Sequence, residues 1–384
     1  MNNEQLKDQE AVKTARPAYA SWGVRIDTTN PDPETAVEYI GAVAGFIPAR
    51  GNEDNGWDKV YPYNEIKPCV LKDGKVAGYI NPDNYGEYLD GRAVTAEDGD
   101  IMVEFPKTYY RIRQDKQFTY VEIADNAAAL ADGFTDFAFS YNGKVQDKFY
   151  VGAYKGRIID DKLRSVGGDY PTTNRTIGQF RAAAQKGGAG YEITPFNKLV
   201  FLQVLYLIRF KSLNSQAAFG KGLTSGSEYG KTGATDTNGL YYGEQDALSR
   251  VKCHGLEDFW GNVWERVDGF ISTPSAIKIA DGNFNDIGVG YTVAKKINKT
   301  VYGITTEIYG DSKLGFIPKA TKDIAPGKTH YCNWGSVWND NSLPFFGGSR
   351  WIDADAGAFS FSCVLGAGDA ASRLGARLCF CGGE

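Results

Sequence analysis

Residues 194–216, TPFNKLVFLQVLYLIRFKSLNSQ, contain an apolar stretch that restricts the folds open to this chain. The spacing predicts a helix with Thr194 as its N-cap and Pro195 at its first position. Apolar side chains fall on nearly every side of this helix, so other parts of the chain must cover it on most sides. The most apolar stretch, Leu199 to Phe210, is too short and too polar to cross a bilayer, so we expect no membrane insertion.

The rest of the sequence is dominated by signals for short strands and turns. Residues 22–27 (WGVRID) and 101–113 (IMVEFPKTYYRIR) alternate apolar and polar side chains, as half-buried strands do. Glycine accounts for 46 of the 384 residues and aromatic residues for 13%, which indicates many turns around aromatic-rich strands. We expect an α+β fold in two parts, a β-rich domain over residues 1–145 and a second domain over residues 146–384. The second domain also carries an amphipathic helix near residues 173–188.

Charge and composition exclude several classes of partner. The net charge of −5, with no local run of basic residues, predicts no nucleic-acid partner. Residues 1–18 read as a polar helix or flexible arm without the apolar segment of a secretory signal, so we expect a protein made in a cytoplasm. Six cysteines without a CxxC spacing are then expected to stay reduced. With only His254 and His330 available, we expect no metal site, no cofactor and no Ser-His-Asp triad.

Residues 255–269, GLEDFWGNVWERVDG, form the most distinctive local motif. Gly261 and Asn262 predict a tight turn between Trp260 and Trp264. Both indoles then need cover, and each ring N–H needs a hydrogen-bond acceptor. Glu265 is costly to bury unless it is hydrogen-bonded, so we expect it to brace a loop and to take no part in chemistry.

The last fifty residues combine a regular frame with an unmatched set of side chains. Small and aromatic residues of the kind that a tightly built backbone needs alternate there with tryptophan, serine and aspartate, a composition typical of binding surfaces. Phe359 and Phe361 alternate with Ser360 and Ser362, which predicts phenylalanines facing the core and serines facing outward. The alternative is that the tryptophans of this segment simply fill a core.

Two of these motifs resemble a known superfamily. The sequence FWGNVWERVDG is similar to the GNVWEW signature of C-type-lectin-fold proteins related to formylglycine-generating enzymes, and the final FGG…AGAF…LGARL is similar to the closing region of that superfamily. More narrowly, the chain resembles the variable proteins of diversity-generating retroelements, some of which are phage receptor-binding proteins. The amino-terminal strands resemble those that precede this module in phage tail proteins, so the resemblance covers most of the chain.

The resemblance implies a rigid lectin fold on which error-prone retrotransposition rewrites selected codons near the 3′ end of the gene. The variable region would span about residues 330–380. From the resemblance and the composition of this segment, the expected ligand-binding residues are Trp334, Ser336, Trp338, Asn339, Ser349, Trp351, Ile352, Asp353, Asp355, Ser360, Ser362, Val364, Leu365, Asp369, Ser372 and Arg373.

The resemblance also implies partners and a location. We expect a receptor-binding protein of a phage or prophage virion tail that recognises a host cell-surface protein or glycan. Residues 1–145 would attach the protein to other tail proteins and form a homo-oligomer, expected to be a trimer. A bacterial surface-displayed adhesin of the same fold and a purely structural tail component remain open alternatives.

Enzyme activity is the other function that this fold supports. In the formylglycine-generating oxidases two active-site cysteines follow a Gly-Gly-Ser element by three and eight residues, positions that Ile352 and Gly357 occupy here. Neither side chain can supply a thiolate, so we expect a binding protein and not an enzyme. Asp353 and Asp355 alternate as carboxylates of a Ca²⁺ site or a glycosidase could, but a solvated loop pair is far commoner.

Overall fold

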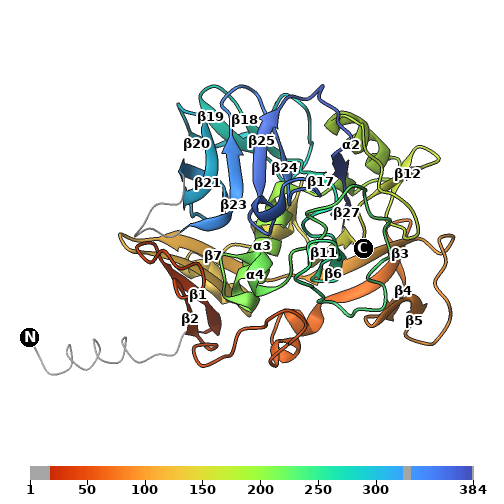
Figure 1. Ribbon diagram of the computed structural model, residues 1–384, viewed down its shortest axis with the longest axis horizontal. Coiled ribbons are helices and arrows are strands. Elements are labelled where there is room, and N and C mark those ends of the chain that lie inside the picture. The colour runs from red at the N-terminus through yellow and green to blue at the C-terminus, as the bar shows by residue number, and fades with distance from the viewer. Residues whose placement is uncertain (1–17, 323–329, 383–384) are drawn as a thin grey trace, which may run out of the picture.

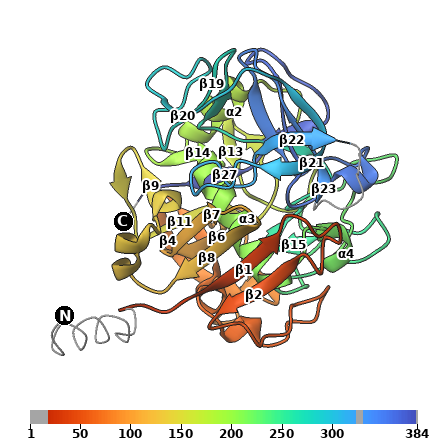
Figure 2. The same ribbon diagram turned by 90° about the vertical axis from the view of Figure 1, so that its left-hand side faces the viewer.

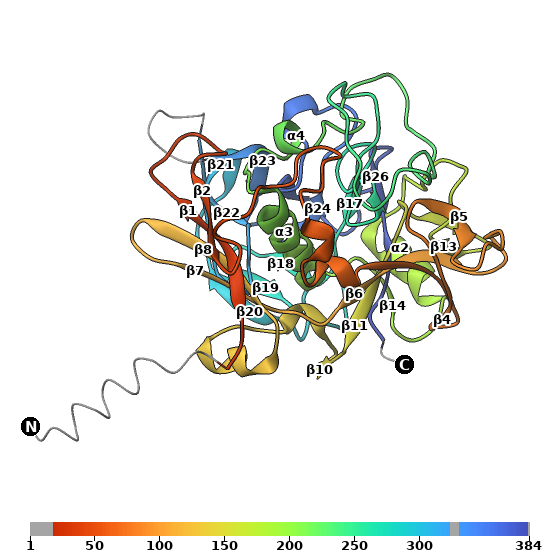
Figure 3. The same cartoon turned by 90° about the horizontal axis from the view of Figure 1, so that it is seen from below.

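The computed structural model of the chain describes residues 18–322 and 330–382. The helix or arm expected over residues 1–18 lies almost wholly outside this part. The described elements are mostly β-strands, arranged as one four-stranded and two seven-stranded sheets around a central helix, with smaller sheets at the periphery (Figure 3).

The amino-terminal part of the chain contributes an antiparallel sheet, whose strands β1 and β2 lie at the lower front of Figure 2. In spatial order its strands are β2 (Val37–Gly41), β1 (Ser21–Asp27), β8 (Phe118–Ala124) and β7 (Tyr109–Gln114). Strand β1 confirms the strand expected over residues 22–27. The strand expected over residues 101–113 is divided between two sheets, because β6 (Asp100–Pro106) ends at a proline and pairs elsewhere.

A second sheet crosses the boundary expected between residues 145 and 146. In spatial order its strands are β14 (Tyr191–Ile193), β27 (Leu378–Phe380), β11 (Lys148–Gly152), β6, β3 (Lys67–Lys72), β4 (Lys75–Asn81) and β5 (Asn84–Tyr88). Strands β6 and β11 pair directly, with Phe105 opposite Phe149. Strands from both sides of the expected boundary therefore share this sheet and one hydrophobic core.

The carboxy-terminal sheet stands at the top of Figure 1 and is hereafter the C-terminal sheet. In spatial order its strands are β22 (Pro318–Lys322), β21 (Val301–Ile308), β23 (Tyr331–Val337), β25 (Phe361–Leu365), β24 (Leu343–Phe346), β17 (Trp264–Arg266) and β26 (Leu374–Ala376). The β23–β25 and β17–β26 pairs are parallel, and the other pairs are antiparallel.

The remaining elements are short. They are the three-stranded sheet β18 (Phe270–Ser272), β19 (Ala276–Ile279) and β20 (Thr292–Lys296), and the pairs β9 (Ser140–Tyr141) with β10 (Lys144–Val145), β12 (Arg157–Ile159) with β13 (Lys162–Arg164), and β15 (Lys252–Cys253) with β16 (Leu256–Glu257). The 3-10 helices are η1 (Trp57–Lys59), η2 (Tyr63–Glu65), η3 (Ala127–Asp132), η4 (Phe137–Phe139) and η5 (Asp353–Asp355).

The central helix is α3 (Phe196–Phe210), and every residue of it is buried, as its all-round apolar sequence predicts. Its Phe201 ring lies 5.9 Å from Tyr110 of β7 and 6.2 Å from Phe149 of β11, and Phe196 lies 6.1 Å from Phe361 of β25. Each of the three large sheets therefore covers one side of α3. In the described part of the chain no helix has both the length and the apolar character needed to span a membrane.

The helix starts differently from the expectation. Pro195 is the N-cap residue, and Thr194 is not, because its hydroxyl donates a 2.7 Å hydrogen bond to the Glu265 carboxylate instead. The amphipathic helix expected near residues 173–188 is confirmed as α2 (Ile177–Gln185), which begins with a capping box formed by Thr176 and Gln179. A single further turn, α4 (Ser215–Ala218), follows α3.

Candidate functional site

Strand register decides which predicted ligand-binding residues share one face of the C-terminal sheet. Ser336 of β23 lies opposite Ser362 of β25, and Trp334 and Val364 each lie two residues from that pair. Side chains two residues apart in a strand point to the same side, so all four occupy one face. Phe361 points to the other side, where it packs against α3 and β18 in the core. We call the side away from α3 the outer face.

Twelve of the sixteen predicted residues lie at or near the surface. Two indoles are the most prominent, because Trp338 exposes 39% and Trp351 49% of its surface. The other exposed members are Asp353, Asp369, Ser372 and Arg373, and the half-buried members are Trp334, Asn339, Ile352, Asp355, Val364 and Leu365.

The prediction of solvent-exposed side chains is wrong for Ser336, Ser349, Ser360 and Ser362, which are buried. Ser336 and Ser362 lie in the middle of the sheet, where their hydroxyl oxygens are 2.7 Å apart and hydrogen-bond to each other. Ser360 precedes β25, so the strand alternation assumed for it does not apply, and its backbone carbonyl accepts from Gly347 N at 2.9 Å. These small serine side chains allow neighbouring backbone segments to pack closely.

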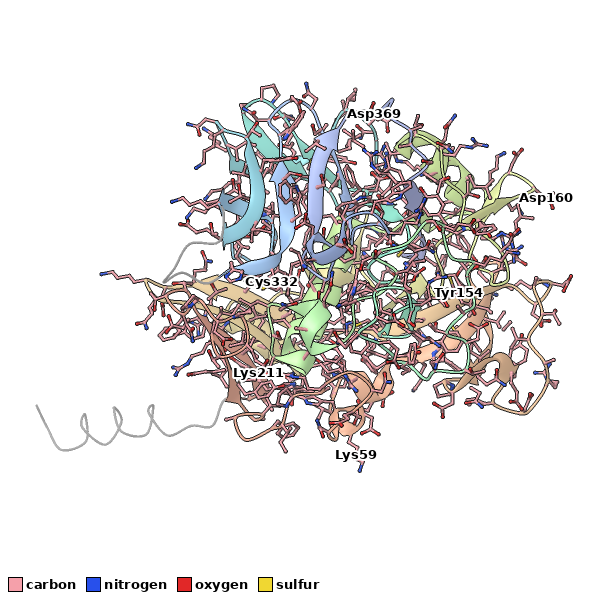
Figure 4. The ribbon with its side chains drawn as sticks, viewed as in Figure 1. Lys59, Tyr154, Asp160, Lys211, Cys332 and Asp369 are labelled. Carbon is pink, nitrogen blue, oxygen red and sulfur yellow. The ribbon has the colours of Figure 1, made fainter. Side chains whose placement is uncertain are left out.

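The exposed residues form two groups at opposite ends of β23. Trp338 N donates to Cys363 O at the carboxyl end, where Figure 4 also shows Asp369 beyond β25. The segment of residues 349–356 lies near the amino end of β23, because Asn333 donates to Ala356 O and Gln216 of α4 donates to the carbonyls of Asp353 and Ala356. Cys332 marks this end in Figure 4.

An apolar cluster joins the two groups along the outer face. Its buried members are Trp264, Phe345 and Leu374, and the half-buried side chains packed on them are Ile352, Val364, Leu365 and Ala371. Trp264 meets Phe345 edge to face with ring centroids 4.9 Å apart, which gives the exposed residues a rigid base. Farther across the sheet, Trp334 packs edge to face on Tyr302 at 4.5 Å.

The tight turn expected at Gly261 and Asn262 is confirmed, and it holds two segments of the site. Both residues have left-handed backbone, with φ of 84° and 61°. The Asn262 side chain accepts from Gly230 N and donates to Gly230 O, at 3.0 Å each, while the backbone carbonyl of Asn262 accepts from Arg350 N. Trp260 is buried and donates from Nε1 to the carbonyls of Gly220 and Lys221. The motif therefore anchors the loop before residue 230 and the segment that begins at residue 347.

Glu265 braces the fold from beneath this motif, as the sequence predicts. Its carboxylate accepts from Lys155 Nζ at 3.1 Å, Arg377 Nε at 2.9 Å and Thr194 Oγ1 at 2.7 Å, and all four side chains are buried. Burial alone would raise the pKa of the Glu265 carboxyl, but Arg377 and Lys155 lower it to about 2. Burial lowers the pKa of Lys155 to about 8 in spite of the carboxylate. Every charge in this cluster is thus satisfied internally.

The thiols nearest the outer face have the properties of inert side chains. Burial raises the pKa of Cys332 to about 12 and that of Cys363 still further above its ordinary value. Only a thiolate acts as a nucleophile or binds copper well, so neither cysteine is prepared for oxidase chemistry. Within residues 18–322 and 330–382, no group of three or more His, Cys, Asp or Glu side chains is arranged to hold a metal ion.

Comparisons with known proteins give distant likenesses only. No family model and no curated protein matches the chain. Among solved structures it is similar to the Major Tropism Determinant U1 variant (11% identity, TM-score 0.31) and M1 variant (12%, 0.32), covering 95% of this chain and 73% of each of those chains. It is also similar to Treponema denticola variable protein 1 (10%, 0.29), covering 73% of this chain and 96% of that one. These are the kind of protein that the sequence motifs resemble, but at TM-scores of about 0.3 the likeness decides neither fold nor function.

Three side chains at the site were not predicted from the sequence. Tyr302 is 62% exposed beside Trp334, and its place in an alternating segment is the signal that could have revealed it. Tyr229 lies in a long polar loop, where no local pattern indicates contact with Trp351 at 5.4 Å. Arg350 was not among the expected ligand-binding residues, although it stacks on both rings.

Proposed function

We propose that the chain is a receptor-binding protein of a phage or prophage tail. It recognises a host surface ligand by non-covalent binding through the outer face of its C-terminal sheet. One observation carries the proposal. Trp338 and Trp351 are exposed at the two ends of a sheet whose other side is packed against the core, with polar groups beside each ring. Rigid aromatic anchors among adaptable polar side chains are what a recognition surface requires.

The proposal also covers variation of the exposed side chains through the gene and assembly of several chains. The side chains at the exposed positions could be exchanged without loss of the fold, because the residues that hold this segment are buried and make their contacts elsewhere. Glu265 and the Asn262 turn are the main ones. Residues 1–145 would attach the protein to the tail and form a trimer, so that several weak sites engage one cell together. Light scattering that finds a monomer in solution would count against that assembly.

The test is attachment of the purified chain to bacterial cells, measured by flow cytometry on a strain that the unaltered chain coats. Trp338→Ala and Trp351→Ala should each weaken attachment by about thirty-fold, since truncating a central interface tryptophan commonly costs 2 kcal/mol or more. Phe46→Ala is the matched control, because Phe46 exposes the same 39% as Trp338 but lies on the amino-terminal part. If the double tryptophan variant attaches as well as the unaltered chain, the outer face does not bind the host.

A further inference from the structure

The guanidinium of Arg350 is held against two aromatic rings. Its Cζ lies 3.9 Å from the ring centroid of Trp351 and 4.4 Å from that of Tyr229. Nη1 donates a 2.7 Å hydrogen bond to Gly226 O, and the whole residue is only 7% exposed. Because the two rings and this bond hold the group in one plane and one rotation, its remaining edge points in a defined direction.

That edge has no hydrogen-bond partner among the described residues. Nη1 makes the only side-chain hydrogen bond of Arg350 among the described residues, and the buried Nε has no partner. No carboxylate of the described chain forms an ion pair with it, although arginine presents Nε and Nη2 as a fork that matches the two oxygens of an oxyanion. Burying guanidinium nitrogens without hydrogen-bond partners costs free energy of folding. This cost suggests that the group is kept to bind a ligand.

The surroundings of Arg350 restrict the chemistry of that group. Trp351 leaves about half of its surface to solvent beside the fork, as a platform for the apolar face of a ring. Asp353 and Asp355 follow directly in η5, exposed and half-buried respectively, and can accept hydrogen bonds from hydroxyl groups. The same two carboxylates repel a ligand that carries many negative charges, such as an acidic peptide.

Building on the proposed function, we propose that Arg350, Trp351 and Tyr229 form a subsite for an acidic sugar of a host glycan. One carboxylate oxygen accepts a hydrogen bond from Nη2 of Arg350, the ring of the sugar packs on Trp351, and hydroxyl groups of the sugar donate to Asp353 or Asp355. The left-handed Asn262 turn positions the subsite, since it binds both Arg350 N and the loop that carries Tyr229.

The test measures binding of sugars to the purified full chain by saturation-transfer NMR and titration calorimetry. The probes are D-glucuronate, its methyl ester, which removes the charge, and D-glucose. Glucuronate should bind at least about ten-fold more tightly than the two neutral sugars, because only it can form a charged hydrogen bond with the guanidinium. Arg350→Lys keeps the charge but loses Nη2 and the planar group that packs on the two rings, and should reduce glucuronate binding by about ten-fold.

Two further variants keep the test sharp. Trp351→Ala removes an exposed side chain, so it should weaken binding while the melting temperature hardly changes, even if Arg350→Lys proves unstable. Arg113→Lys is the matched control, because Arg113 also stacks on a tyrosine, Tyr120 at 3.7 Å, but already pairs with Glu122. It should leave glucuronate binding unchanged.

Equal binding of glucuronate and glucose, or unchanged binding by a folded Arg350→Lys chain, would overturn the subsite. Tighter binding of poly-glutamate than of glucuronate would do so as well, since it would indicate an acidic protein ligand. Failure of the subsite and failure of the proposed function are distinguishable. If attachment to cells depends on Trp338 but not on Arg350, the proposed function is retained and the subsite is rejected. If glucuronate binds but the chain attaches to no cell, the subsite is retained and the proposed function is rejected.

Discussion

Replacing Glu265 by Gln tests whether the buried charge cluster supports the frame of the outer face. The substitution preserves the shape of the side chain and an acceptor for Thr194, but it leaves Lys155 and Arg377 buried without an anion. Arg377 still donates to four backbone carbonyls, so Lys155, which donates a hydrogen bond only to Glu265 among the described residues, carries most of the loss.

The magnitude follows from the pKa of Glu265. The carboxyl titrates at about 2 in the folded chain against an ordinary value of 4.5. At 1.36 kcal/mol per pH unit the ionised carboxylate contributes about 3 kcal/mol to the free energy of unfolding at pH 7. Because the folded pKa is the lower one, this contribution is present above pH 4.5 and is lost as the pH falls towards 2. At pH 3 about 1 kcal/mol of it should remain.

Urea unfolding, followed by tryptophan fluorescence at pH 7 and pH 3, measures both quantities. Glu265→Gln should be about 3 kcal/mol less stable than the unaltered chain at pH 7, and the gap should narrow to about 1 kcal/mol at pH 3. Glu97→Gln is the control, because Glu97 is exposed and its removal should change little. Adding Lys155→Met to Glu265→Gln should restore part of the stability, since it removes the stranded cation. A gap at pH 7 below 1 kcal/mol, or one of equal size at both pH values, would refute this account of the cluster.

Two further predictions concern stability. Ser336→Ala or Ser362→Ala alone should cost about 1–2 kcal/mol, because each leaves a buried hydroxyl unpaired, whereas the double variant should be nearly as stable as the unaltered chain; simply additive losses in thermal unfolding would contradict this. Burial raises the pKa of Glu192 to about 7, although Tyr141 and Gln185 donate hydrogen bonds to it. A carboxyl with a raised folded pKa contributes stability below pH 4.5 that is lost as the pH rises through 7. Glu192→Gln should therefore be more stable than the unaltered chain by about 3 kcal/mol at pH 8 and equally stable at pH 4, which chemical denaturation at the two pH values can show.

Local patterns in the sequence were sufficient for several parts of the fold. The all-round apolar character of residues 196–210 required a helix at the centre, and the structure places it there. The Gly261–Asn262 pair required a turn with left-handed backbone, because few other residues adopt positive φ without strain. The exposed positions of Trp338 and Trp351 agree with the recognition surface expected from composition, while ligand binding by them remains a prediction.

Other features depended on neighbours far away in the sequence. Thr194 has the sequence context of an N-cap, but Glu265, distant in the chain, supplies a stronger partner for its hydroxyl. Ser362 alternates with Phe361, as a residue on the outer face should. Ser336 of the neighbouring parallel strand pairs with it, however, and both hydroxyl groups are buried in the middle of the sheet. The pairing of β6 with β11 across residue 145 likewise joins segments that no local pattern relates.

The sequence by itself determined where the chain must turn, which helix must be central, and which segment has the composition of a binding surface, because periodicity and backbone preference are local properties. Only the tertiary structure decided which of those side chains reach solvent and that Arg350 contacts both Trp351 and a tyrosine more than a hundred residues earlier. Exposure and charge pairing depend on which strands and loops pack together, and that outcome results from the whole core and is not encoded within any single segment.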